Sequence, residues 1–322
     1  MNLLLYGGGA VGLGLASCLI QSGHQVDIIA REDTVDVLNA LGLRRSGLFG
    51  DFHATPDTFN CYASLNDLPE NDFDYILVCA KSFDTSAAAK DLASCSFVKN
   101  SAGRVVHFQN GWGNAEKLAA FFPVERIYTA RVITGFSRPR KNHVEITVHA
   151  DAIHLGSLFG GDLSAMEPLA RSIHSGGIPC EVTPEVEKDL VAKLLYNCAL
   201  NALGAIFNVP YGILGDHAES RSIMQGIVEE VFQVMDAAGH ATHWTTSGDY
   251  LEVFYDQQLP PTYKHESSML QDLRARKKTE IDAINGAIVE LGEKLNIPVP
   301  HNRMVRDMVK FLESVKPKIF SF

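Results

Sequence analysis

The sequence predicts an α/β domain followed by an all-α domain. In the first part of the chain, short apolar strand-like runs alternate with helical segments, as in a parallel sheet covered by helices. From about residue 184 the strand-like runs disappear and long helical periodicity begins. A chain of 322 residues is long enough for two domains of ordinary size. We therefore place the α/β domain at residues 1–183 and the helical domain at residues 184–322.

The first thirty residues have the order strand, turn, helix, turn, strand. The apolar run L-L-L-Y at residues 3–6 predicts the first strand, and Q-V-D-I-I-A predicts the second. Between them, residues 10–21 have helical composition, and Gly23 stands where that helix should end. This order is typical of a βαβ unit.

The turn after the first strand has the spacing G-x-G-x-x-G. Such glycines permit a tight turn, let the backbone approach a pyrophosphate, and let the helix pack closely on the strand. The helix N-terminus then faces the phosphates with free N–H groups. Between a strand and a helix, this spacing predicts a Rossmann-like dinucleotide-binding domain. The predicted cofactor contacts in the turn are Gly7, Gly9, Ala10, Val11 and Gly12.

The end of the second strand indicates which dinucleotide is bound. Sites selective for NADH usually have an acidic residue there to bind the ribose hydroxyls, but here Ala30 is followed by Arg31. Arginine binds a 2′-phosphate through charge-assisted, often bidentate hydrogen bonds, which favours NADPH. Glu32 and Asp33 follow at once, and NADH would be accepted if Glu32 turned inward.

Two polar residues follow later strand-like runs of the α/β domain. Lys81 comes after F-D-Y-I-L-V-C-A, and Asn110 comes after G-R-V-V-H-F-Q. Ligands of open α/β sheets lie outside the carboxyl ends of the strands, so both residues are candidate cofactor contacts. Their position alone also allows both to be solvated loop residues.

The helical domain opens with a long apolar helix that reaches Phe207, with Thr183 as a candidate N-cap and Pro184 at the first helical position. Further helical segments are predicted over residues 221–238, 267–296 and 301–316. These last helices are amphipathic enough to be part of the core or to form the face of a homodimer.

Three polar residues, Lys193, Asn197 and Asn201, are spaced four apart on the long apolar helix. Residues four apart are offset by about 40°, so the three lie along one slowly drifting stripe. Because a buried polar group costs free energy unless it is paired, the stripe is either a polar seam between helices or the wall of a wet cleft. In a cleft, the Lys193 ammonium would point at a substrate carbonyl or alcohol.

Glu280 in the segment T-E-I-D is a candidate carboxylate partner for the lysine, on a helix of the same domain. It follows Lys277 and Lys278, and could instead be an exposed partner of these two. Ser267 and Ser268 could cap the helix that follows, or one of them could bind a substrate carboxylate or hydroxyl.

Composition narrows the class of protein. The net charge of −10 disfavours nucleic-acid binding, which needs a basic face. The six cysteines form no C-x-x-C pair and no zinc-like spacing with histidine, so we expect no metal site. We find no signal peptide and no apolar run of about 18 residues, and we expect a cytoplasmic protein without a membrane segment.

Taken together, these motifs resemble the ketopantoate reductases (2-dehydropantoate 2-reductases) over nearly the whole chain. The motifs occur in the family's order: Y-G-G-G-A-V-G-L-G-L-A, C-A-K-S-F-D, Q-N-G-W-G-N, K-L-L-Y-N-C-A-L-N-A-L-G-A, and finally S-S-M-L-Q-D with T-E-I-D. The last two are the most specific. The resemblance implies hydride transfer from NADPH to the 2-keto carbon of 2-dehydropantoate, which yields (R)-pantoate on the way to pantothenate and coenzyme A.

The resemblance also implies residue roles. Lys193 matches the catalytic lysine that protonates the carbonyl oxygen, and Glu280 matches the acidic residue that orients this lysine and the substrate. Asn110 matches the asparagine at the nicotinamide end of the cleft. The substrate-binding polar groups are matched by Asn197, Asn201 and Ser268, and the cofactor phosphate and ribose contacts by Arg31 and Lys81; Asn110 and Glu280 are expected to contact both ligands.

One segment departs from the family pattern. T-A-R-V-I-T-G-F-S-R-P-R-K carries Arg131, Arg138, Arg140 and Lys141 where relatives more often have small residues. Arg131 could grip an acidic substrate in the cleft or could be a surface charge. Two alternatives therefore stay open: a related dehydrogenase for another branched or aromatic 2-keto acid, with NADH in some cases, and a cofactor-binding sensor without turnover.

Overall fold

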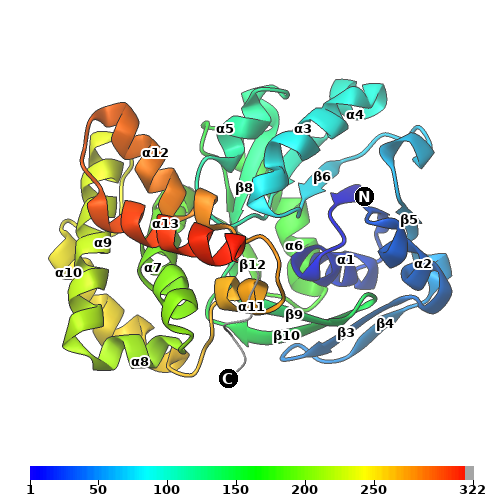
Figure 1. The fold of residues 1–322 in the computed structure, drawn as a ribbon. Helices are drawn as coiled ribbons and strands as arrows, with labels where there is room; N and C mark the ends of the chain where they lie inside the picture. Colours follow the sequence, from blue (N-terminus) through cyan, green and yellow to red (C-terminus); the bar gives the residue numbers. More distant parts are fainter. Residues whose placement is uncertain (316–322) are drawn as a thin grey trace. The chain divides into compact units, whose positions relative to one another are not determined.

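The computed structural model describes residues 1–315, and the chain forms two compact units, Met1–Glu187 and Lys188–Phe322 (Figure 1). The first unit is built on an eight-stranded sheet. Its strands, in spatial order, are β12 (Cys180–Val182), β11 (Ile153–Gly156), β8 (Ile127–Arg131), β7 (Arg104–His107), β6 (Tyr75–Val78), β1 (Asn2–Tyr6), β2 (Gln25–Ile29) and β5 (Asn60–Tyr62).

Six neighbouring strands, from β8 to β5, are parallel, and β11 and β12 run the other way. Parallel strands are covered by helices on both faces and are apolar throughout, as in β1, where Leu3, Leu4 and Leu5 are fully buried. The chain leaves β1 for β2 on one side and later returns to β6 on the other side. This reversal of strand order is the place where open α/β sheets bind a ligand.

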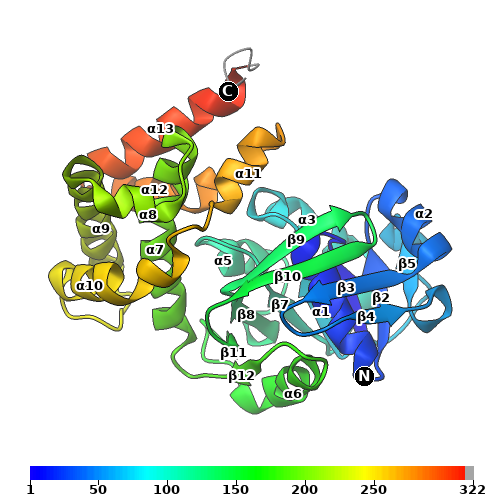
Figure 2. The ribbon, with the colours of Figure 1, turned by 90° about the horizontal axis from the view of Figure 1, so that it is seen from below.

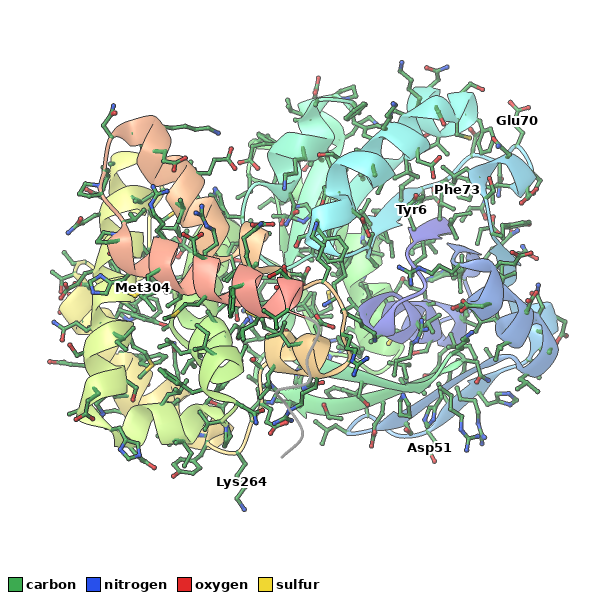
Figure 3. The ribbon with its side chains drawn as sticks, in the orientation of Figure 1. Tyr6, Asp51, Glu70, Phe73, Lys264 and Met304 are labelled. Atoms are coloured by element: carbon green, nitrogen blue, oxygen red, sulfur yellow. The ribbon has the colours of Figure 1, made fainter. Side chains whose placement is uncertain are left out.

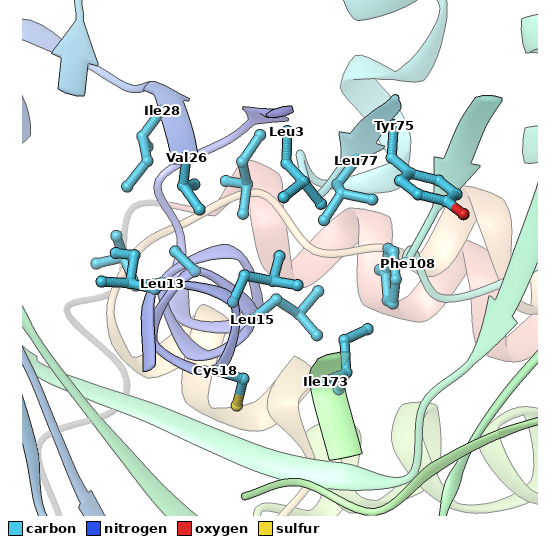
Figure 4. Packing of buried hydrophobic residues seen from close by; sticks show 14 of the residues in the cluster. Leu3, Leu13, Leu15, Cys18, Val26, Ile28, Tyr75, Leu77, Phe108 and Ile173 are labelled. Atoms are coloured by element: carbon cyan, nitrogen blue, oxygen red, sulfur yellow. The ribbon is translucent and has the colours of Figure 1, made fainter. Parts of the chain in front are cut away.

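Helix α1 (Ala10–Gln21) lies between the main sheet and a second sheet (Figure 2). The second sheet has the order β4 (Phe52–Ala54), β3 (Leu43–Gly47), β10 (His143–His149) and β9 (Thr134–Arg140), and the sequence did not predict it. Because both of its faces are covered, α1 is apolar nearly all round: Leu13, Leu15 and Cys18 are fully buried (Figure 4). The other helices of this unit are α2 (Glu32–Leu41), α3 (Thr85–Ser94), α4 (Ser96–Asn100), α5 (Asn114–Ala119) and α6 (Glu167–Ser175).

The second unit is helical. Its helices are α7 (Val186–Phe207), α8 (Tyr211–Asp216), α9 (Ala218–Ala237), α10 (Ser247–Val253), α11 (Ser268–Arg274), α12 (Asn285–Leu295) and α13 (Pro300–Ser314). The α/β architecture followed by a helical part confirms the predicted fold class.

Three sequence-based expectations for this part are corrected. The helix expected over residues 267–296 is interrupted after Arg274, where Arg276 has a φ of 55°, and resumes as a short 3₁₀ turn (Ile281–Ala283) before α12. Thr183 does not cap α7, because that helix begins at Val186; its Oγ1 instead accepts a hydrogen bond from the Glu185 amide at 3.0 Å. Residue 316 of the predicted last helix lies outside the described residues.

The third correction concerns α7. No apolar run of membrane-spanning length was expected, yet by length and composition α7 is long and apolar enough to cross a membrane. The structure buries 72% of its apolar window, as in the core helix of a globular unit.

The last helix, α13, leaves Met304, Met308 and Phe311 exposed at the surface; Met304 is labelled in Figure 3. The homodimer stays a prediction.

Candidate functional site

Two glycines of the predicted phosphate-binding turn stand where no side chain fits. Gly7 has a φ of 119°, and a Cβ atom there would lie 2.7 Å from the amide nitrogen of Ala80 at the end of β6. A Cβ atom on Gly12 would lie 2.1 Å from the Gly7 carbonyl oxygen. The turn and its close packing on β1 and β6 therefore require glycine at both positions.

Gly9 is different, because nothing lies within 4 Å of the position that its Cβ atom would take. It is the N-cap of α1, its amide donates to the Gly7 carbonyl at 2.8 Å, and its carbonyl accepts from the Leu13 amide at 2.9 Å. Ala10 and Val11 follow in the first helical turn, where amides have no partner within the helix. Open space in front of a helix N-terminus fits the pyrophosphate of a dinucleotide.

Arg31 lies at the predicted position, directly after β2 and at the N-cap of α2. Its carbonyl accepts from the Thr34 and Val35 amides at 2.8 and 3.0 Å, while its side chain is exposed. Glu32 begins α2 and is also exposed. Asp33 pairs with Lys141 of the loop after β9, with 2.6 Å between Oδ2 and Nζ.

Lys81 and Asn110 both lie beyond the carboxyl ends of parallel strands, β6 and β7, in half-buried positions. Their loops are held together by Gln109, whose Nε2 donates to the Ala80 carbonyl at 2.9 Å and to Thr85 Oγ1 at 2.8 Å. Asn114 completes the arrangement, because its Nδ2 donates to the Asn110 carbonyl at 3.0 Å and its Oδ1 accepts from Thr85 Oγ1 at 2.9 Å.

Sequence analysis missed these three residues. Gln109, Asn114 and Thr85 are all at least 95% buried. A usable signal was present: a glutamine and an asparagine flank the candidate Asn110 in Q-N-G-W-G-N, and buried amides of this kind hold backbone groups in place.

In the second unit, α7 carries the polar stripe. Lys193 is half-buried, and Asn197 and Asn201 are buried. Asn201 has local partners: its Oδ1 accepts from the Tyr211 hydroxyl at 2.6 Å, and its carbonyl accepts from Ser267 Oγ at 3.2 Å. The Asn201 end of the stripe is thus part of a satisfied seam between helices.

The two serines of S-S-M-L-Q-D have different positions. Ser267 is fully buried and caps α11, with its Oγ accepting from the Leu270 amide at 3.0 Å. Ser268 is exposed at the start of α11. Of the two, Ser267 therefore acts as the cap, and Ser268 is the exposed one.

Glu280 is only 6% exposed, so its interpretation as an exposed partner of Lys277 and Lys278 is wrong. It precedes the 3₁₀ turn, and its carbonyl accepts from the Ala283 amide at 3.0 Å. The preceding Thr279 donates its amide to Glu313 Oε1 of α13 at 2.6 Å. These bonds fix the backbone on both sides of the Glu280 side chain.

A buried polar network, which sequence analysis also missed, joins four helices of this unit. Asn285 of α12 donates from Nδ2 to the Cys198 carbonyl of α7 at 3.1 Å and to Asn302 Oδ1 of α13 at 3.0 Å. Asn302 Nδ2 donates to Glu230 Oε2 of α9 at 2.8 Å. Asn285 stands five residues after Glu280, so the network ties the Glu280 segment to α7.

Arg131 is not a surface charge. It is 4% exposed, and its Nη2 lies 2.7 Å from Asp151 Oδ2. Burial raises the pKa of Asp151, but the hydrogen bond and the charge of Arg131 outweigh this and hold the pKa below its usual value. Because the guanidinium pairs within its own unit, Arg131 ties β8 to the segment before β11.

These features define a class: a dinucleotide-binding α/β unit with Rossmann strand order, followed by a helical unit that carries a lysine, two amides and a buried carboxylate. The chain matches the family model "Ketopantoate reductase PanE/ApbA" over residues 3–160 and the model of the C-terminal part of the same family over residues 185–313. The chain belongs to the ketopantoate reductase family and is an oxidoreductase of that family.

Individual proteins similar to this chain support the same family. A 2-dehydropantoate 2-reductase of Aquifex aeolicus is 34% identical over 317 residues, 97% of each chain. The crystal structure of a PanE/ApbA family ketopantoate reductase from Ralstonia eutropha is 30% identical, has a TM-score of 0.82, and covers 97% of this chain and 98% of that one. D-mandelate dehydrogenase, solved with NADH and anilino(oxo)acetate, is 23% identical with a TM-score of 0.84 over 97% of this chain and 98% of that one, and shows the fold alone.

Proposed function

We propose that this protein reduces 2-dehydropantoate to (R)-pantoate with NADPH, in the pathway to pantothenate and coenzyme A. The observation that carries the proposal is the match of both units to one family. The second unit also carries the lysine, the two amides and the buried carboxylate to which the resemblance assigns roles. The protein is expected to act in the cytoplasm on a small 2-keto acid, without nucleic acid or membrane.

The chain's own residues supply binding and proton transfer. Reduction of a carbonyl builds negative charge on its oxygen, and the ammonium of Lys193 is proposed to stabilise this charge and then protonate the oxygen. Glu280 is proposed to orient the ammonium, and its buried, backbone-fixed position suits this role. Asn197 and Ser268 are proposed to hold the substrate. Asn201 is proposed to take part through its side-chain nitrogen, since its Oδ1 accepts from Tyr211.

When bound, NADPH supplies the hydride to the keto carbon. The glycine turn fits its pyrophosphate, because the close approach at Gly7 and Gly12 and the open space at Gly9 leave bare backbone in front of the α1 N-terminus. Arg31 is proposed to bind the 2′-phosphate. Along the strand ends, Lys81 and Asn110 are proposed to contact the ribose and nicotinamide end, with Glu280 as a further contact.

The experiment is loss of NADPH absorbance with 2-dehydropantoate, run beside NADH and beside a bulky aromatic 2-keto acid. Fast turnover that is selective for NADPH and 2-dehydropantoate is the expected result. Turnover only with the aromatic acid, or mainly with NADH, would overturn the substrate or the cofactor and favour a related 2-hydroxy acid dehydrogenase. Dinucleotide binding without any turnover would favour the sensor.

A further inference from the structure

Arg138 reaches from the second sheet to the glycine turn of the nucleotide-binding sheet. It lies on β9, and its Nη1 donates a short hydrogen bond to the carbonyl oxygen of Gly8. The register of β9 against β10 shifts here, so that Arg138 and Pro139 oppose the single residue Val144. Such a bulge re-aims a side chain, and proline, which lacks an amide donor, is tolerated in it.

The glycine turn brings Arg138 close to the end of β2. A Cβ atom on Gly8 would lie 2.6 Å from the Cβ atom of Ala30, so Gly8 packs closely against Ala30, and Arg31 is the next residue. Burial lowers the pKa of Arg138, Asp33 raises it, and the Arg31 charge lowers it, which places Arg31 and Asp33 within electrostatic range. Arg31, which follows a strand of the main sheet, and Arg138, on the second sheet, thus lie within electrostatic range of each other.

Within the described part of the chain, neither guanidinium forms a direct ion pair with a carboxylate. Among residues 1–315, the Arg31 side chain makes no hydrogen bond or ion pair, and Arg138 makes only its bond to Gly8. Asp33, the acid that acts on Arg138, is engaged by Lys141 at 2.6 Å, and this hydrogen bond is the main cause of the lowered pKa of the Asp33 carboxyl. The Asp33 carboxylate that acts on Arg138 is thus shared with Lys141, which leaves positive charge in excess here, and such an excess favours a bound anion.

We propose that Arg138 and Arg31 together bind the 2′-phosphate of NADPH, and that Lys141 holds Asp33 away from this phosphate. The inference rests on the proposed use of NADPH. The ribose next to the adenine lies at the end of the second strand of a Rossmann sheet, which is where both arginines stand. Arg138 would use its Nε and Nη2, since Nη1 is engaged by Gly8. Residues from both sheets would then determine the specificity for the 2′-phosphate. The bond from Arg138 to Gly8 would link the 2′-phosphate site to the glycine turn that binds the pyrophosphate.

The experiment is isothermal titration of the purified full chain with NADP⁺ and NAD⁺, and with adenosine 2′,5′-bisphosphate and 5′-AMP. The variant is Arg138→Gln, and Arg140→Gln is the matched control, because Arg140 has the same charge on the same strand and is likewise exposed, whereas the bond to Gly8 comes from Arg138. Arg138→Gln is expected to weaken NADP⁺ and the bisphosphate about tenfold or more and to leave NAD⁺ and 5′-AMP within about twofold. The control is expected to change none of the four affinities by more than about twofold.

Three results are decisive. Equal weakening of NADP⁺ and NAD⁺ by Arg138→Gln would overturn the inference and make Arg138 a positioning residue of the glycine turn. If the native chain prefers NADP⁺ and Arg138→Gln keeps the same ratio of NADP⁺ to NAD⁺ affinity, the inference is overturned and the proposed cofactor stays. A native chain that binds NAD⁺ as tightly as NADP⁺ would overturn the proposed cofactor itself. Lys141→Gln is a second variant, expected to weaken NADP⁺ more than NAD⁺ because it releases the Asp33 carboxylate.

Discussion

The side-chain amide of Asn285 donates a hydrogen bond of 3.1 Å to the carbonyl oxygen of Cys198 in the middle of α7. Cys198 lies between Lys193 and Asn201 on that helix, and Asn285 opens α12 shortly after Glu280. Asn285 is fully buried, so this bond is shielded from water. It connects the segment that carries the proposed proton donor with the segment that carries the proposed orienting carboxylate.

Replacing Asn285 with alanine is therefore expected to affect stability and turnover together. The change leaves the Cys198 carbonyl and the Asn302 amide oxygen without their buried donor, at a cost of about 2–3 kcal/mol in the free energy of unfolding. Without the bond from Asn285, α7 is held less firmly, and a small displacement of Lys193 on that helix should lower kcat by about tenfold. Thermal unfolding and steady-state kinetics measure both, with Asn39→Ala, on the exposed face of α2, as the control. A stable, fully active Asn285→Ala protein would contradict the proposed link.

The role of Lys193 makes a sharper prediction for kinetics. Removing a general acid that also stabilises the developing charge costs about 100-fold or more, so Lys193→Ala should lower kcat at least that much while NADPH binding is retained. Lys264→Ala is the control, because Lys264 is an exposed lysine of the same unit (Figure 3). Stopped-flow reduction and NADPH titration separate chemistry from binding. A loss in kcat below tenfold would rule out Lys193 as the acid.

The glycine turn allows folding and cofactor binding to be separated. Gly9 has a φ of −82°, and nothing lies within 4 Å of its absent Cβ, so Gly9→Ala should fold with a nearly unchanged Tm. The added methyl group would occupy the space proposed for the pyrophosphate, so dinucleotide affinity should fall by about tenfold or more. Gly12→Ala, with a Cβ 2.1 Å from the Gly7 carbonyl, should instead lower Tm clearly. Unchanged dinucleotide binding by Gly9→Ala would place the pyrophosphate elsewhere.

Local patterns predicted local structure well. Residues 10–21 were expected to be helical, and α1 is Ala10–Gln21, because helical composition and the flanking glycines act over neighbouring residues. The second sheet could not be found this way: β3 pairs with β10, about a hundred residues later, and although β10 (H-V-E-I-T-V-H) alternates polar and apolar residues, its partner β3 (L-R-R-S-G) does not. Pairing over such a distance leaves little trace in the local sequence.

In the candidate site, too, features set by neighbouring residues were predicted and features set by residues far apart in the chain were not. The stripe on α7 followed from helical spacing, but Asn285, which contacts that helix, stands 87 residues away from Cys198. The interruption of the helix after Arg274 depends on the left-handed backbone conformation of Arg276. Arginine seldom adopts this conformation, and no sequence motif predicts it here. The buried position of Glu280 then follows from tertiary bonds such as Thr279 to Glu313.

His107 gives the last prediction, on pH. It lies at the end of β7, is 3% exposed, and neither ring nitrogen has a hydrogen-bond partner among the described residues. Burial lowers its pKa from 6.5 to about 4, so the unfolded chain binds the proton more readily. Stability from the neutral ring is therefore fully present above about pH 6.5 and is lost as the pH falls towards 4, by up to roughly 3 kcal/mol.

Urea unfolding at pH 4.5, 5.5, 6.5 and 7.5 tests this for His107→Leu, with His53→Leu, an exposed histidine of the same unit, as the control. In a Trp244→Phe background, fluorescence reports Trp112 of the first unit, because the chain has two tryptophans. The native chain and the control should lose stability towards pH 4.5, and His107→Leu should lose less because its unfolded state no longer gains that proton. If the free energy of unfolding of all three proteins decreases equally towards pH 4.5, His107 is not the group responsible, and other titrating groups set the acid sensitivity of this unit.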